Sequence, residues 1–303
     1  MSSYTIIYVL PFYLSPTTRP SPSLSRDAPS VIRARIRLVS ASVTVSSIVT
    51  IYVLSITVTP SAVEIFRLLG WYPIPLPEIA QSLLLTALLF AGPLFEKGVV
   101  ESGWREWIRG GSLHETLSSW IGWRNFVAGP ITEELVFRSL LIPLHLLTSM
   151  TPSQIIFLCP LYFGIAHIHH FYEFTLTHPH TPLVPALVRS LIQFGYTTVF
   201  GWFATFLFLR SGSVWAAVLA HSFCNWAGLP RVWGKVEGSA IIGPVGKEER
   251  QRGKEDEDPV QVADGKLAIL WTVAYYALLF LGAGAFHKCL WPLTESRRAL
   301  VKI

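Results

Sequence analysis

The chain has 303 residues, of which 51% are hydrophobic and 14% are charged. A soluble domain carries about 25% charged residues, so this composition excludes an ordinary water-soluble protein and favours one embedded in a lipid bilayer. The formal net charge is +5, but the basic residues form no stripe with interleaved aromatics, which excludes nucleic-acid binding as its explanation. In a membrane protein such an excess is typical of cytoplasmic loops and helix ends.

Apolar segments that approach the length of a membrane span follow one another along most of the chain. A spanning helix needs about 20 predominantly apolar residues. In chain order, the expected helices are a half-length segment at 4–14 and then 38–58, 78–95, 126–147, 154–170, 183–209, 214–229 and 267–290. This pattern predicts an all-α, multi-pass transmembrane bundle of about seven to eight helices. We expect segment 4–14 to be the end of a spanning helix whose first half is truncated.

Three polar stretches separate these segments. Residues 15–37 carry five arginines and are predicted to form a cytosolic loop. Residues 96–124 mix four tryptophans with charges, a composition that suits an interfacial amphipathic stretch. Residues 231–266 are predicted to form a polar loop, and the dense run of both signs at 247–258 indicates a solvated linker. We expect one domain over 1–303, with its catalytic core at about 126–229.

Ionisable residues inside apolar segments are costly and are therefore candidates for function. Glu133, Glu134 and Arg138 lie in the segment 126–147. Glu134 and Arg138 are four residues apart, with the acid first, which is the favourable order for an ion pair on a helix. Glu133 points about 100° away and keeps a carboxylate that suits a general base. The competing interpretation is a helix end with three solvated charges.

Two later segments each carry a pair of residues at helical spacing. Phe163 and His167 are four residues apart, as are His221 and Asn225, so each pair shares one face of its helix. His221 and Asn225 can both donate hydrogen bonds toward one point, as the donors of an oxyanion hole do. Alternatively, His167 is a satisfied core residue and the second pair makes a polar contact between helices.

Together these residues favour attack of an activated water on a peptide carbonyl. One free carboxylate, two histidines and an asparagine on separate apolar helices are difficult to explain by packing. A nucleophilic pair of His221 with Cys224 remains open from the spacing alone. The adjacent His169 and His170 fall at the predicted end of their segment, where we expect them to be solvated.

The three motifs, in this order on successive apolar segments, resemble those of the CPBP intramembrane proteases, and most closely the eukaryotic CAAX prenyl protease branch. The stretch from Arg26 to Ile32 also resembles that branch. The resemblance covers nearly the whole chain. It implies that Glu133 activates water with His167 as its partner, and that His221 and Asn225 stabilise the oxyanion.

The same resemblance implies which residues support the site, which reaction is catalysed and where the protein is located. Glu134, Arg138 and Phe163 take supporting roles. The implied reaction removes the last three residues, -aaX, from prenylated CaaX proteins of the Ras type. The implied place is the endoplasmic reticulum membrane, with the bilayer around the protein and the active site open to the cytosol. No cofactor is implied.

Two alternatives compete with this hypothesis. A zinc-dependent membrane protease would use Glu and the two His as ligands, although the sequence has no HExxH motif. A non-catalytic membrane scaffold or a proton-coupled transporter would use the same buried charges as a relay.

Overall fold

The computed structural model describes residues 2–237 and 265–303, and all regular structure in these two ranges is helical. The expected all-α, multi-pass class is confirmed. The charge run at 247–258, and with it most of the predicted polar loop, lies outside the described residues.

Four of the described helices are long and apolar enough to cross a membrane. They are Pro29–Thr57, Pro152–Thr177, Leu183–Ser211 and Leu267–Cys289. A fifth span results if the bent pair Leu76–Leu89 and Ala91–Val100 counts as one. The remaining expected segments are helical as well, but they are shorter or broken into several pieces.

The chain divides into two compact units. Unit 1 comprises Met1–Thr86, Glu115–Trp226 and Cys289–Ile303, and it contains every predicted site residue. Unit 2 comprises the described residues of Ala87–His114 and Ala227–Lys288.

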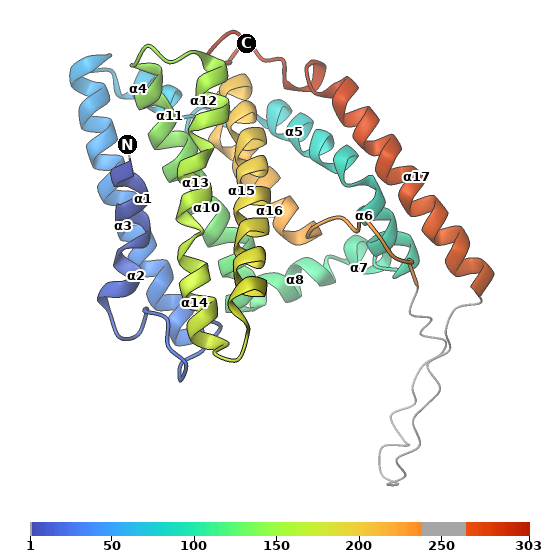
Figure 1. Cartoon of the computed structure of the whole chain (residues 1–303). Coiled ribbons are helices and arrows are strands. Elements are labelled where there is room, and N and C mark those ends of the chain that lie inside the picture. Colours follow the sequence, from blue (N-terminus) through green and yellow to red (C-terminus); the bar gives the residue numbers. More distant parts are fainter. Residues whose placement is uncertain (1, 238–264) are drawn as a thin grey trace. The chain divides into compact units, whose positions relative to one another are not determined.

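Unit 1 contains two long helices, α3 and α15, and many shorter ones (Figure 1). The first group is α1 (Ser2–Val9), α2 (Pro11–Leu14), α3 (Pro29–Thr57), α4 (Ala62–Leu68), α5 (Leu76–Leu89) and α8 (Gly111–Ser118). The second is α9 (Trp120–Gly122), η2 (Trp123–Ala128), α10 (Gly129–Glu134), η3 (Leu135–Leu140) and α11 (Leu141–Leu146). The third is α12 (Pro152–Leu158), α13 (Pro160–Ala166), α14 (His169–Thr177), α15 (Leu183–Ser211), α16 (Val214–Ala227) and the 3₁₀ turn η4 (Pro292–Thr294).

Unit 2 is built from α6 (Ala91–Phe95), η1 (Glu96–Val100), α7 (Trp104–Arg109) and most of α17 (Gly265–Cys289). Arg231 joins its parts, since its guanidinium lies 2.8 Å from a Glu96 oxygen and its backbone N–H donates to the Tyr275 hydroxyl at 2.7 Å.

Glycines allow α15 to pack closely along α13. Figure 1 shows α12, α13 and α14 following one another beside the long α15. A Cβ on Gly164 would lie 2.5 Å from the Thr198 hydroxyl, and one on Gly201 would lie 2.6 Å from the Pro160 side chain. Membrane helices associate through such small residues, because lipid supplies no hydrophobic force to hold them together.

Hydrogen bonds from two tyrosines attach α1 to the helices around it. The Tyr4 hydroxyl lies 2.6 Å from the Thr50 hydroxyl of α3, and the Tyr8 hydroxyl lies 3.0 Å from the Thr132 hydroxyl of α10. Both tyrosines are buried. The second bond holds α10 one residue before Glu133.

Two of the differences from the expected helix boundaries move residues that line the cavity of the candidate site. Helix α3 begins at Pro29, so Arg33, Arg35 and Arg37 lie on its first turns instead of in a loop. Proline favours the first helical turn, where its missing N–H costs no hydrogen bond. The segment predicted to end at residue 170 continues through α14 to Thr177, which places His169 and His170 on a helix.

Candidate active site

The two adjacent glutamates lie on a short α-helix between two π-helical turns. Helix α10 carries Glu133 and Glu134, η2 precedes it and η3 follows it. π-turns inside helices are rare and occur frequently at functional sites, where they change the direction in which side chains point. Pro130 lies in the first turn of α10 and needs no N–H there.

Glu134 is the centre of a buried ion-pair network. Its Oε1 accepts a hydrogen bond from Nη1 of Arg138 at 3.1 Å, as the spacing predicted. The same oxygen lies 2.7 Å from Nδ1 of His221 on α16. The Glu134 side chain is 0% exposed. A carboxylate acts as acceptor here, so the Nδ1–H of His221 donates to it.

Aromatic rings cover the other side of the Arg138 guanidinium. Its carbon lies 4.5 Å from the centre of the Phe163 ring and 5.7 Å from that of Phe200. The Phe200 ring also contacts His221, with 4.6 Å between ring centres. These cation–π contacts help to hold a buried charge that would otherwise be costly.

Glu133 lies at the edge of this network and, unlike Glu134, is not paired with Arg138. Its side chain is 21% exposed, and its Oε2 lies 3.8 Å from Nε2 of His221, which is longer than a hydrogen bond. His221 therefore stands between the two carboxylates, with one ring nitrogen toward each. The sequence hypothesis paired Glu133 with His167, whereas the nearest ionisable side chain to its carboxylate among residues 2–237 and 265–303 is His221.

His167 follows the last turn of α13. Its Nδ1 lies 2.8 Å from the Phe163 carbonyl oxygen. A carbonyl only accepts, so Nδ1 carries the proton and Nε2 of the neutral ring is an acceptor. The Phe163 and His167 rings meet edge to face at 4.6 Å, which confirms that they share a face of the helix.

Asn225 extends the site from α16. Its Nδ2 donates to the Asn125 carbonyl oxygen at 2.8 Å. The amide group has two N–H donors, so this bond orients it and leaves the second donor for another acceptor.

A cavity of about 180 Å³ brings the predicted residues together. Glu133, His167 and Asn225 line it, as do Phe163, His169 and His170. His221 is buried and does not line the cavity, but its Nε2 lies 3.8 Å from the Oε2 of Glu133, which does. The lining also includes polar residues that the motif spacing did not single out, among them Tyr8, Arg26, Arg35, Arg124 and Asn125. The sequence gives little sign that they belong to a site, because three of them are arginines next to apolar segments, where basic residues are common in any membrane protein.

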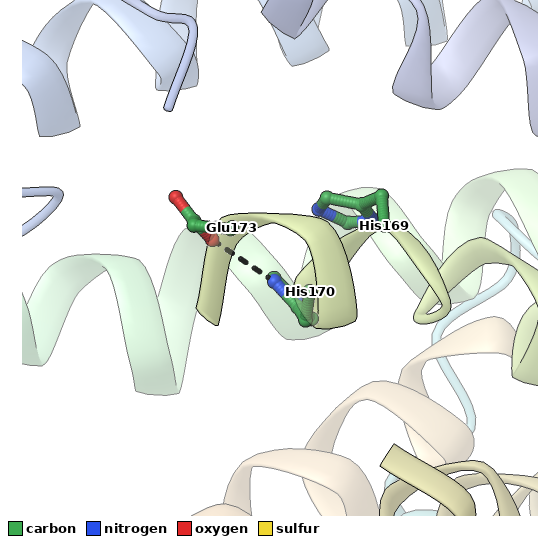
Figure 2. Close-up of side chains that lie close together, drawn as sticks. All are labelled: His169, His170 and Glu173. Carbon is green, nitrogen blue, oxygen red and sulfur yellow. Dashed lines mark hydrogen bonds and ion pairs between the residues drawn. The ribbon is translucent and has the colours of Figure 1, made fainter. Parts of the chain in front are cut away.

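In the part of the chain that the structure describes, one group of three side chains of the metal-ligand type comes together, formed by His169, His170 and Glu173 of α14 (Figure 2). Their donor atoms lie within 4.8 Å of one another. Both histidines are half-buried rather than solvated, because α14 continues beyond them. Both Glu173 oxygens also contact arginines, at 2.8 Å from Arg35 and 3.3 Å from Arg26, which disfavours a metal cation there.

Comparisons with known proteins decide the family. The family model described as type II CAAX prenyl endopeptidase Rce1-like matches residues 115–227. The probable CAAX prenyl protease 2 of Schizosaccharomyces pombe is 40% identical, over 77% of this chain and 81% of its own. The chain belongs to the Rce1-like CAAX prenyl endopeptidase family. The CAAX prenyl protease 2 of Arabidopsis thaliana is 37% identical, over 79% of this chain and 83% of its own. The CAAX prenyl protease 2 of Homo sapiens is 34% identical, over 71% of this chain and 66% of its own.

As a member of the Rce1-like family, the chain is a peptide hydrolase of the multi-pass membrane class. The matched range 115–227 holds all three motifs, from Glu133 to Asn225. No solved structure gives a significant match to this chain.

Proposed function

We propose that this chain is an intramembrane endopeptidase that removes the -aaX tripeptide from prenylated CaaX proteins, within a single catalytic domain whose core is about 126–229. The observation that carries the proposal is the cavity, which gathers Glu133, His167 and Asn225 from three helices, with His221 beside Glu133. The names of the curated relatives support the substrate class.

Glu133 is the base that activates water. It is the one carboxylate of the pair that reaches the cavity, whereas Glu134 is held by Arg138 and His221. The Glu133 carboxylate takes a proton from water as the oxygen attacks the scissile carbonyl, and it returns that proton to the leaving amine. His167, with Nε2 as an acceptor, orients the same water.

His221 and Asn225 stabilise the negative charge that develops on the carbonyl oxygen. Because Nδ1–H of His221 donates to Glu134, its Nε2 can donate only in the doubly protonated ring. Arg138 pairs with Glu134 within the same buried set, which limits the cost of burying that carboxylate. Asn225 supplies its second N–H, because the first is fixed on Asn125.

The proposed location is the endoplasmic reticulum membrane, with the cavity open to the cytosol. A prenyl chain partitions into lipid and carries the cytosolic tail of the substrate to the bilayer. The arginines at the start of α3 and in the preceding loop favour a cytosolic position for that side of the protein.

The test is cleavage of a farnesylated CaaX peptide by membranes that contain the wild-type chain, Glu133→Gln or Glu64→Gln at matched expression. Glu64 is the control, since it is exposed on α4 in a surface pair with Arg67. We expect wild-type and Glu64→Gln to cleave, and Glu133→Gln to lose about 100-fold or more. Full activity of Glu133→Gln would remove it as the base, and an inactive wild-type chain would refute the protease proposal.

A further inference from the structure

Three arginines line the same cavity as the candidate base: Arg26, Arg35 and Arg124. They come from the loop before α3, from α3 itself and from η2. We call them the arginine cluster. They are far apart in sequence, and only the fold brings them to one cavity.

The arginine cluster has more positive than negative charge. Glu173 is 4% exposed and binds Arg26 and Arg35, while Asp27 lies 2.6 Å from Nη1 of Arg124. In the part of the chain that the structure describes, these two carboxylates are the only acidic groups paired with the three guanidiniums. One positive charge is therefore left facing the cavity, and it would be balanced by an anionic ligand.

Arg26 is the member best placed to bind that ligand. Its side chain is 43% exposed, against 14% for Arg35 and 21% for Arg124. Its guanidinium has five N–H donors, and its contact with Glu173 is a single bond of 3.3 Å. Arg35, by contrast, donates to both Glu173 and the Thr18 carbonyl oxygen, so its role is to hold Glu173.

We infer that the arginine cluster, through Arg26 with support from Arg124, binds the free C-terminal carboxylate of the peptide substrate. This inference rests on the proposed function. An enzyme that cuts three residues from the end of a chain must recognise that end, and three extended residues span at most about 11 Å. Arginine binds carboxylates through two parallel hydrogen bonds, which fix position as well as charge.

A phosphate of an anionic lipid headgroup is the other anion that arginines near a bilayer bind. The substrate carboxylate is favoured because the arginine cluster lines the cavity that also contains Glu133 and His167. The two ligands differ in one measurable respect, since only the carboxylate can be removed by changing the peptide.

The experiment compares two farnesylated peptides of the same sequence, one ending in a carboxylate and one in a carboxamide. Cleavage of each is measured with the wild-type chain, Arg26→Gln, Arg124→Gln and the control Arg67→Gln, in vesicles with and without phosphatidylserine. Arg67 is a matched control because it is an exposed arginine with one ion pair, outside the cavity. We expect the wild type and Arg67→Gln to prefer the carboxylate by about 10- to 100-fold in kcat/KM.

Arg26→Gln is expected to bring the ratio of kcat/KM for the carboxylate peptide to kcat/KM for the carboxamide peptide close to one. Arg124→Gln is expected to reduce this ratio less. A variant that merely folds poorly lowers both rates and leaves their ratio unchanged. Equal cleavage of both peptides by the wild type would overturn the inference while leaving the proposed function intact, and cleavage of neither would reject the proposed function itself. A loss in Arg26→Gln that is equal for both peptides and appears only with phosphatidylserine would assign the arginine cluster to lipid instead.

Discussion

Replacing Arg138 alone by methionine is expected to destabilise the protein more than replacing both members of its ion pair. Arg138 and Glu134 have side chains 1% and 0% exposed, with 3.1 Å between Nη1 and Oε1. Without Arg138, the Glu134 carboxylate stays buried with His221 as its remaining partner. Removing one partner of a buried pair costs about 3–5 kcal/mol. At roughly 2 °C per kcal/mol for a chain of this size, the melting temperature falls by about 6–10 °C.

The double variant Glu134→Gln/Arg138→Met removes both charges of the pair and is expected to recover more than half of that loss. Glutamine still accepts from His221, and the methionine sulfur keeps a contact with the ring of Phe163. Melting in detergent, followed by tryptophan fluorescence, measures the difference. Arg67→Met is the control, since its exposed pair with Glu64 contributes no more than about 1 kcal/mol. If the melting temperature of Arg138→Met equalled that of the wild type or that of the double variant, the argument from an uncompensated charge would be wrong.

Three further outcomes are expected. Asn225→Ala should lower kcat about 100-fold with little change in KM, because its amide acts on charge that forms only in the transition state; a change confined to KM would contradict this. Tyr8→Phe should cost about 1 kcal/mol of stability by removing the hydrogen bond to Thr132, and Tyr4→Phe serves for comparison; an unchanged melting temperature would show that the bond adds nothing. Cleavage should persist in metal-stripped buffer with a strong chelator, because Glu133 activates the water directly; loss of activity that added zinc restores would favour the zinc alternative.

The features that could be predicted from the sequence are those set by neighbouring residues. Glu134 and Arg138 form their ion pair, and Phe163 contacts His167, because residues four apart lie on one face of a helix. The all-helical class followed from the length of the apolar segments, since a backbone in lipid must satisfy its own hydrogen bonds. The start of a helix at Pro29 was not predicted, because the arginines after it were interpreted as part of a cytosolic loop.

The partners of the candidate site residues needed the tertiary structure. The spacing of the motifs gave no reason to place His221 between Glu133 and Glu134, because that contact joins residues 87 apart. The π-turns around α10 were also invisible, since π and α turns differ in backbone hydrogen bonding and not in a residue pattern that one sequence displays.

The amino-acid pattern alone therefore decided that this protein lies in a membrane as helices and which polar side chains those helices carry, because hydrophobicity and helical periodicity act over a few residues. Tertiary packing decided which of those side chains meet. It brought Tyr8 to Thr132 across 124 residues, and it brought the arginine cluster to the cavity of Glu133. The cost of burying a charge without a partner selects these contacts, and that cost depends on the three-dimensional surroundings rather than on the local sequence.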